Sequence, residues 1–324
     1  MKYITAKVDL GEKETFQKYN GKFLKESDAQ DLLNVTEDTA IMKPVASLDG
    51  SDVPLAYVIC NAYPNDNVRN VLASIEDTTT MRANCSGPID HEEMKRKGLI
   101  EGRDYKLRTP NSYHVRTKSG GWGMIAYASE ISSIMVGYKR GRFTGAIDAS
   151  GWTKDNPQKF EILKEIAVYN EKAFKTANPT IYNKQKKFAE SFIRPEHRIG
   201  IFTTLSANRY HSGQTAQMSA HVDSGDTSFG LTSMCVFKSD SDYEGAYLIF
   251  PRYGIGIAAP DNSVLICDSL QIHGVSPIRG NGERFSAVAY CDNRLATIGA
   301  AGKSERLIGK YANKESGSLE TFFE

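Results

Sequence analysis

Two histidines and an aspartate in the second half of the chain have the residue types and the spacing of a metal site. His221-Val222-Asp223 lies in QMSAHVDSGD, and His273 follows a predicted strand in SLQIHGVSP. Alternate residues of an extended strand share a face, so an H-x-D pair can present both side chains to one ion. Two imidazoles and one carboxylate bind non-haem Fe(II) on one face of its octahedron and leave positions for a bidentate co-substrate and O₂.

A third motif strengthens this interpretation, because H-x-D alone also fits a core histidine beside a turn aspartate. Arg284-Phe285-Ser286 opens the last predicted strand, eleven residues after His273. A 2-oxoacid that chelates iron needs its far carboxylate held, and a guanidinium with a hydroxyl on the same strand face suits that role. The alternative for Arg284 is a surface ion pair. The combination of the three motifs favours the metal site.

The elements that must position these residues are short strands. From residue 199 the chain contains apolar, β-rich runs separated by turn signals such as Pro-Asp-Asn and Gly-Asn-Gly: IGIFTTLSA, LTSMCVF, AYLIF, GIGIAA, SVLICD and RFSAVAYC. Several short strands at regular spacing predict a sandwich or barrel, with a jelly roll among the natural options.

Helical patterns lie before residue 199. The clearest covers 156–178, with Pro157 at a favoured first position and an apolar stripe at helical spacing, and a second covers about 181–193. Shorter helices are predicted near 24–34, 66–76 and 90–98. No linker divides the chain, so we expect one compact domain over 1–324. In it a helical, partly basic region (1–198) wraps a β core (199–295) that carries the site.

Charge is unevenly distributed, although the net charge is only +1. Residues 1–94 carry a net −7 and residues 199–270 a net −4, whereas residues 95–198 carry 21 basic and 10 acidic residues, a net +11. Such a stretch suits a polyanion, because Lys and Arg displace counterions from phosphates. A solvated helical face with lysine-rich loops is the alternative.

The composition places limits on the class of protein. With 324 residues, 40% hydrophobic and 24% charged, the chain is an ordinary globular sequence. Five cysteines form no C-x-x-C pair, no apolar run is long enough to span a bilayer, and the first residues lack a secretion signal. We expect a cytoplasmic protein, in the host cytoplasm if a phage encodes it, that is not secreted and has no membrane or protein partner.

The H-x-D, distant His and R-x-S set resembles the Fe(II)/2-oxoglutarate dioxygenase superfamily. The segments HVDSGD and DYEGAYLIFPRYGIGIAAPDNSVLICDSLQIHGVSPI are similar to its TET/J-binding-protein branch, which oxidises the 5-methyl group of pyrimidines in nucleic acid. The shared features are H-x-D-x-G-D, G-[GA]-x-x-x-F-P-x-[YF]-G, D-x-x-x-x-H and the terminal R-x-S strand. The clear match covers about 199–294, with weak similarity around TMRANCSGPI (80–89).

This resemblance implies an α+β fold whose core is a double-stranded β-helix (jelly roll) with flanking helices from the N-terminal region. It implies Fe(II) held by His221, Asp223 and His273, with 2-oxoglutarate as co-substrate and O₂ as oxidant. Arg284 and Ser286 would hold the distal carboxylate of 2-oxoglutarate. No catalytic residue apart from the metal ligands is expected.

The resemblance also implies contacts to substrate and co-substrate. Asn208 and Tyr210 match an N-x-Y segment that contacts 2-oxoglutarate, with a strand-end turn as the alternative. Asp226 matches a polar residue on the edge of a flipped base, or is a turn aspartate, and Tyr290 matches an aromatic residue that stacks on the base, or is a core residue. The remaining candidates are Arg82, and Asp292 at a position where relatives often have histidine.

The predicted function is hydroxylation of the 5-methyl group of 5-methylcytosine in DNA, with the base flipped out of the stack. Asp226 favours cytosine, because a carboxylate accepts a hydrogen bond from its exocyclic amine, whereas an ionised Asp292 would suit the N3–H of thymine. The alternatives are therefore a thymine (J-type) hydroxylase, or a 2-oxoglutarate hydroxylase of an amino acid, peptide or small metabolite. A DNA-binding module with an inactive core is disfavoured by the complete ligand set.

Overall fold

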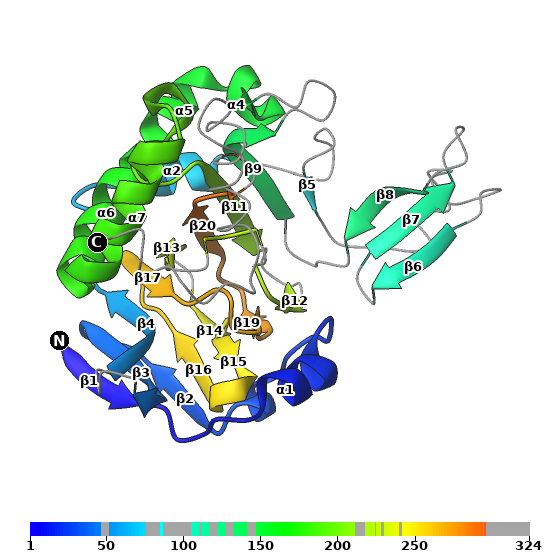
Figure 1. The fold of residues 1–324 in the computed structure, drawn as a ribbon, viewed down its shortest axis with the longest axis vertical. Helices are drawn as coiled ribbons and strands as arrows, with labels where there is room; N and C mark the ends of the chain where they lie inside the picture. The colour runs from blue at the N-terminus through cyan, green and yellow to red at the C-terminus, as the bar shows by residue number, and fades with distance from the viewer. Residues whose placement is uncertain are drawn as a thin grey trace.

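Figure 1 shows the fold in a computed structural model of the 324-residue chain. The residues that the structure describes are 1–46, 52–75, 85–86, 105–109, 112–116, 122–127, 132–140, 147–210, 218–223, 225–227, 230–239, 242–293 and 295. The helix predicted near 90–98 and the candidate Arg82 lie outside these residues.

A ten-stranded sheet runs through the molecule. Its strand order is β1 (Lys2–Thr5), β3 (Thr39–Ala46), β4 (Asp52–Ile59), β17 (Ser263–Cys267), β13 (Thr232–Lys238), β20 (Arg284–Tyr290), β11 (Thr204–Tyr210), β9 (Ser132–Arg140) and β10 (Ile147–Ala149), with β5 (Cys85–Ser86) also paired to β9. The four strands from β17 to β11 thus lie between strands that precede residue 150. The expectation of a mainly helical region before residue 199 therefore differs from the structure, because part of that region forms sheet.

A smaller sheet faces the large one and completes the β core. It contains β12 (Met218–His221), β18 (His273–Val275), β15 (Leu248–Phe250), β16 (Ile255–Ala258) and β2 (Asp31–Asn34). Buried apolar side chains from both sheets pack between them, including Leu55, Val236, Phe250, Ile255 and Leu265. This confirms the predicted α+β fold with a double-stranded β-helix core.

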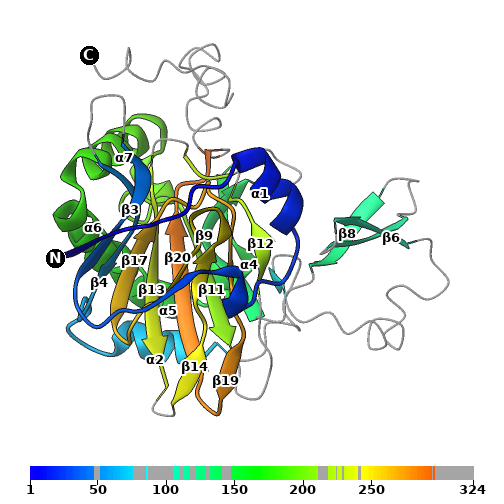
Figure 2. The same cartoon turned by 90° about the horizontal axis from the view of Figure 1, so that it is seen from below.

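Two further sheets lie beside this core. One pairs β14 (Tyr243–Gly245) with β19 (Ile278–Gly280). The other contains β6 (Tyr105–Thr109), β7 (Ser112–Arg116) and β8 (Trp122–Tyr127), and both Figure 1 and Figure 2 show it apart from the main body.

Helices cover the face of the large sheet that points away from the small sheet (Figure 1). These are α2 (Asn67–Ala73), α4 (Gly151–Asp155), α5 (Pro157–Leu163), α6 (Glu165–Ala177) and α7 (Pro179–Phe192). The predicted helix over 156–178 is interrupted at Lys164, and the predictions near 181–193 and 66–76 correspond to α7 and α2. Asn178 caps α7, because its side chain accepts a hydrogen bond of 2.9 Å from the amide of Ile181. No described helix is long and apolar enough to cross a membrane.

The helix predicted over 24–34 is wrong. This segment contains one helical turn, η1 (Glu26–Asp28), in which the Asp28 carboxylate accepts from the Lys25 amide, and then the strand β2. The capping signal is real, but parallel pairing of β2 with β16 satisfies the backbone that a longer helix would have used. The other short helices are α1 (Glu12–Tyr19), η3 (Pro195–His197) and η4 (Pro251–Tyr253).

The two-residue period of the strands decides which side chains face the small sheet. On β13, Cys235 and Phe237 pack under the helices, whereas Met234 and Val236 belong to the core between the sheets. On β20, Phe285, Ala287 and Ala289 take the helix side. The remaining side chains of that strand therefore point to the inner face, which is where the predicted site residues of β20 and β11 lie.

Candidate active site

The three predicted metal ligands lie together at the edge of the small sheet. His221 ends β12 and His273 begins β18, and the antiparallel register places these two residues directly opposite each other. Nε2 of His221 is 3.4 Å from Oδ1 of Asp223, and Nε2 of His273 is 3.8 Å from its Oδ2. One ligand atom from each residue lies within 4.8 Å of the other two, so the group can hold one metal ion.

The protonation states of the group favour metal binding. Burial and the neighbouring charge of His221 lower the pKa of His273, and its Nδ1 lies 2.9 Å from the carbonyl of Gln271. A neutral ring that donates through Nδ1 keeps the lone pair of Nε2 for a metal. Burial works against the charge of Asp223, but the hydrogen bond from His221 and the electrostatic attraction of both imidazole groups hold its pKa below the usual value. The carboxylate is therefore ionised at neutral pH.

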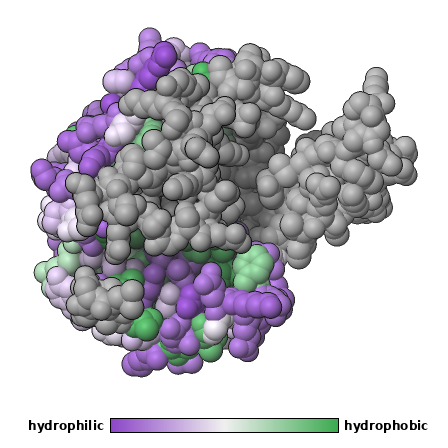
Figure 3. Space-filling view, in the orientation of Figure 1, coloured by the Kyte–Doolittle hydropathy of each residue, from purple (hydrophilic) through white to green (hydrophobic). Residues whose placement is uncertain are grey.

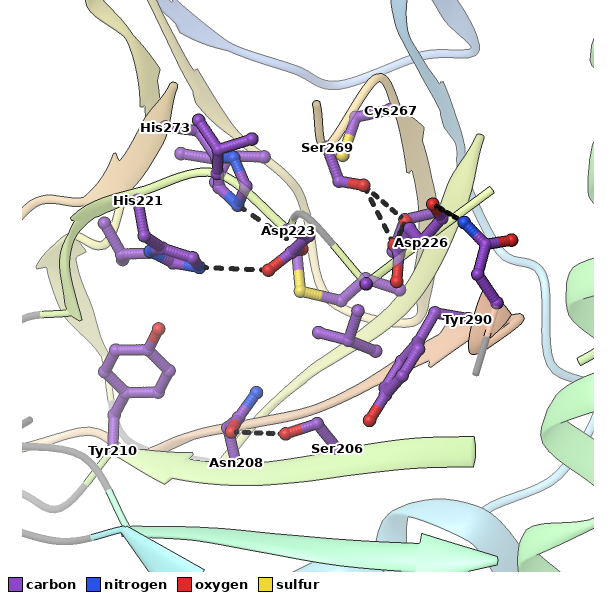
Figure 4. A pocket seen from close by; sticks show the side chains of 18 residues that line it. Ser206, Asn208, Tyr210, His221, Asp223, Asp226, Cys267, Ser269, His273 and Tyr290 are labelled. Carbon is purple, nitrogen blue, oxygen red and sulfur yellow. Dashed lines mark hydrogen bonds and ion pairs between the residues drawn. The ribbon is translucent and has the colours of Figure 1, made fainter. Parts of the chain in front are cut away.

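A cavity of about 640 Å³ opens beside these ligands (Figure 4). Nitrogen atoms of His221 and His273 point toward Asp223 on one side, and Asp226, Ser269 and Tyr290 lie on the other side. Strand β11 contributes its inner-face residues to the same cavity: Ser206, Asn208 and Tyr210. The volume is in the range typical of small-molecule sites in proteins.

Arg284 and Ser286 lie on the inner face of β20; they are not themselves among the described residues that line the cavity, but Arg284 contacts two that are. The Arg284 side chain is 5.0 Å from the ring centroid of Tyr210, and its NH2 lies 3.9 Å from Sδ of Met234. Tyr210 and Met234 both line the cavity. The strand register places Asn208 opposite Ser286 and Tyr210 opposite Arg284, so the four predicted co-substrate residues form one patch on adjacent strands.

This patch has unused hydrogen-bond donors. NH1 of Arg284 and Oγ of Ser286 are buried and have no hydrogen-bond partner among the described residues. Unpaired buried donors are costly, and a carboxylate satisfies a guanidinium and a hydroxyl together. Burial raises the pKa of Tyr210, against the effect of Arg284, so this phenol also stays a donor. The patch therefore fits the distal carboxylate of 2-oxoglutarate, and the three-ligand group fits the metal that the other end of 2-oxoglutarate chelates.

Asp226 is held at the opposite end of the cavity by two hydroxyls. Thr232 and Ser269 both donate to its Oδ2, the latter at 2.9 Å, which leaves Oδ1 for a ligand. Burial and the negative charge of Asp223 raise the pKa of Asp226 to about 8. At neutral pH its carboxyl group is therefore mainly protonated and can both donate and accept a hydrogen bond.

The other predicted substrate residues are placed differently. Tyr290 is half-buried at the end of β20 and lines the cavity, as its proposed role requires. Asp292 is buried, and its amide donates to Oγ1 of Thr203 at 2.9 Å. Asp292 is not among the described residues that line the cavity, whereas its neighbour Asn293 is.

Sequence reasoning missed the three polar residues of the cavity that contact Asp226. Thr232 and Ser269 fix Asp226, and Nδ2 of Asn293 donates to the backbone carbonyl of Asp226 at 2.6 Å. These residues come from three separate segments, and no spacing in the sequence connects them. The closeness of Asn293 to Asp292 in the sequence was the only available signal.

Comparison with NgTET1 supports the fold. NgTET1 in complex with 5mC DNA is similar at 12% sequence identity and a TM-score of 0.50, with 89% of this chain and 93% of that chain covered. A 2OG-Fe(II) oxygenase family oxidoreductase from Burkholderia pseudomallei matches at 13% identity and a TM-score of 0.35, with 69% of this chain and 90% of that chain covered. No protein-family model and no curated protein sequence matches this chain.

At these sequence identities the similarity shows the fold alone, and the chemistry has to be inferred from the side chains of this chain. The double-stranded β-helix is shared with NgTET1, and the histidine–aspartate–histidine group is observed directly in this chain. Together they are consistent with a 2-oxoglutarate/Fe(II) dioxygenase, the class of enzyme predicted from the sequence. Fe(II), 2-oxoglutarate and O₂ are the cofactor and co-substrates that this arrangement implies.

Proposed function

We propose that this chain hydroxylates the 5-methyl group of 5-methylcytosine in DNA and acts as a single dioxygenase domain. The observation that carries the proposal is that one cavity joins three metal ligands to a partly satisfied carboxyl group and an aromatic ring. These are the groups needed to orient a flipped pyrimidine beside a metal.

At the metal end, the residues bind and orient. His221, Asp223 and His273 would hold Fe(II), while Arg284 and Ser286 would hold the distal carboxylate of 2-oxoglutarate. When bound with O₂, the iron and 2-oxoglutarate supply the oxidising chemistry, with release of succinate and CO₂. No residue of the protein needs to act as an acid or base, because the task of the chain is to set distances and to exclude competing reactions.

At the end of the cavity that contains Asp226, the residues would recognise the flipped base. Asp226 lines the cavity, and its Oδ1, which is not used by the hydrogen bonds from Thr232 and Ser269, can accept from the exocyclic amine of cytosine. A protonated Asp226 can also donate to the bare N3 of the same ring. Tyr290 offers a flat face for stacking. The earlier argument for thymine depended on Asp292, which is not among the described residues that line the cavity.

The DNA backbone needs a positive surface outside this cavity. The lysines of α6 and α7 do not provide it, because these helices pack on the face of the large sheet opposite the small sheet, which carries His221 and His273; Figure 3 shows mainly hydrophilic residues on the helix side. We assign the phosphate contacts to the clusters within 95–108 and 139–142, most of whose side chains lie outside the described residues.

The test is to incubate the anaerobically Fe(II)-loaded protein with 2-oxoglutarate, O₂ and DNA whose only methylated pyrimidine is either 5-methylcytosine or thymine. Mass spectrometry of the nucleosides should show the gain of one oxygen on 5-methylcytosine. Gain on thymine alone would move the assignment to a thymine hydroxylase. Succinate without an oxidised nucleoside would contradict the DNA substrate and favour a small-molecule hydroxylase.

A charge-neutralised variant sharpens this test. Replacing the basic residues of 139–142 with Gln should weaken DNA binding and reduce its dependence on salt. A protein with fewer cations in contact with phosphates displaces fewer counterions from the DNA when it binds. A hydroxylase of a small metabolite should be indifferent to this change. The Lys7→Met variant, which alters one exposed lysine, serves as the control for a general loss of charge.

A further inference from the structure

The turn from Asp268 to Gln271, between β17 and β18, contacts three residues of the cavity. The carbonyl of Gln271 lies 2.9 Å from Nδ1 of His273. The carbonyl of Ser269 accepts a 3.0 Å hydrogen bond from the backbone amide of Asp223, and Oγ of Ser269 donates to Asp226 at 2.9 Å. The position of this turn therefore sets the position of two metal ligands and of the carboxyl group at the base end.

The Asp268 side chain organises the turn. Its Oδ1 accepts from the amide of Leu270 at 3.1 Å, and its Oδ2 accepts from Nε2 of Gln271 at 3.0 Å. Its own amide donates to the carbonyl of Leu55 on β4 at 2.9 Å. The Asp268 carboxylate thus links the first residue of the turn to the last. The Asp268 backbone amide links the turn to the large sheet.

A lysine from another strand neutralises this carboxylate. Nζ of Lys43, on β3, lies 2.6 Å from Oδ2 of Asp268, and the two side chains are only 12% and 14% exposed. The other described lysine–carboxylate ion pairs are more exposed on both sides, such as Lys7 with Asp31 at 74% and 39%. Removing one partner of a buried ion pair is strongly destabilising, because the remaining charge is left buried and uncompensated. The Asp268 carboxylate can therefore hold the turn only while Lys43 is present.

We propose that Lys43 and Asp268 are a positioning pair that fixes the iron-ligand geometry of His273 and Asp223 through the turn between β17 and β18. Neither residue is among the described residues that line the cavity, so they act through the turn and not on substrate. The inference rests on the metal site alone and is independent of which substrate the enzyme hydroxylates.

The test compares Lys43→Met with Lys7→Met, a matched control that removes the same charge from an exposed ion pair. Fe(II) affinity is measured without O₂ by competition with a chromophoric chelator, at a temperature where thermal unfolding shows both variants folded. Lys43→Met should weaken Fe(II) binding by about 10- to 100-fold, the usual effect of losing a group that orients a metal ligand. Lys7→Met should leave the affinity unchanged.

Two further measurements separate positioning from general stability. At saturating Fe(II), the KM for 2-oxoglutarate in Lys43→Met should rise less than the Kd for Fe(II), because Arg284 and Ser286, which would hold its distal carboxylate, belong to β20 and not to the turn. Lys43→Arg should recover most of the Fe(II) affinity, since it restores the charge. A parallel loss of 2-oxoglutarate and Fe(II) affinity, or no recovery with arginine, would contradict the proposal.

The double variant Lys43→Met/Asp268→Asn covers the case in which Lys43→Met fails to fold. It leaves no unpaired buried charge, and Asn can still accept from the amide of Leu270. We expect it to fold and to bind Fe(II) at least about tenfold more weakly than the wild type. Wild-type Fe(II) affinity in the folded double variant would overturn the proposal. Because these readouts use no DNA, they stand even if the DNA substrate is wrong.

Discussion

The two faces of the large sheet use the same strands for opposite purposes. On the helix side, β13 and β20 present Cys235, Phe237 and Phe285, which pack in an apolar cluster. On the inner side, β20 presents Arg284 and Ser286, whose NH1 and Oγ atoms lack hydrogen-bond partners among the described residues. The first face contributes stability through apolar burial, and the second sacrifices stability to keep donors ready for a ligand. Alternate residues of the same strand therefore serve two functions: those on one face pack in the core, and those on the other face are available to bind a ligand.

The largest effect should come from the metal ligands beside the inner face. Asp223→Asn keeps the shape of the side chain but removes the negative charge between His221 and His273. We expect the loss of detectable succinate formation and of Fe(II) binding, with the protein still folded by circular dichroism. Fe(II)-dependent turnover that survives in this variant would show that the metal lies elsewhere.

On the helix side, Phe237→Ala should act on stability alone. The ring is fully buried, and its centroid lies 5.0 Å from that of Tyr63. Removing a buried Phe side chain costs about 3–5 kcal/mol of unfolding free energy, measurable by urea denaturation. The KM for 2-oxoglutarate of the folded fraction should not change. A rise in this KM would mean that the two faces are coupled.

Asp226 should make the stability of the metal-free protein depend on pH. An Asp in the unfolded chain loses its proton near pH ~4, whereas folded Asp226 keeps it until about pH 8. Between these values the folded state binds more protons, so its contribution to stability falls as the pH rises, by at most about 1.4 kcal/mol per pH unit. Asp226→Asn should flatten the profile in urea denaturation of the chelator-treated protein. Parallel profiles for the two proteins would contradict the raised pKa.

The smallest effects on stability and activity should come from replacing two buried serines, one on each face of the sheet. Ser286 and Ser233 are both fully buried with an unpartnered Oγ among the described residues, but by strand alternation Ser286 faces inward and Ser233 outward. Either serine-to-alanine variant should leave the stability of the metal-free protein unchanged or raise it by about 1 kcal/mol. Only Ser286→Ala should weaken 2-oxoglutarate binding, by about tenfold, the effect of one lost hydrogen bond to a charged group. Equal 2-oxoglutarate affinity in the two variants would argue against the proposed carboxylate patch.

Local patterns predicted the parts of the fold that local physics determines. The apolar runs after residue 199 and the stripe of 156–178 correspond to strands and helices, and the inner-face residues of β11 and β20 follow from alternation. The sequence analysis predicted none of the strands β1 to β4, and two of them, β2 and β4, pair with strands remote in the sequence. β4 pairs with β17, which brings Ala56 beside Cys267, and a pattern confined to one segment cannot reveal such a pairing.

The site divides in the same way. His221, Asp223, His273, Arg284 and Ser286 belong to motifs whose spacing suits a single chemical task, so the sequence alone was enough to predict them. The residues that support them did not follow from any motif. Lys43 is 225 positions from Asp268, and Thr232, Ser269 and Asn293 meet Asp226 only in the folded chain. Asp292 was predicted from its match to a position where relatives often have histidine, yet among the described residues Asn293 lines the cavity and Asp292 does not.

The interleaved order of the large sheet also has a consequence for biosynthesis. β3 and β4 leave the ribosome about two hundred residues before β17, the strand that pairs with β4. Until then the hairpin carries an unpaired edge, which is a template for association with other chains. Because distant pairings close slowly, the nascent chain should be exposed to aggregation for longer than a protein whose sheet grows from neighbouring strands. Expression at low temperature or with holdase chaperones should therefore raise the soluble yield.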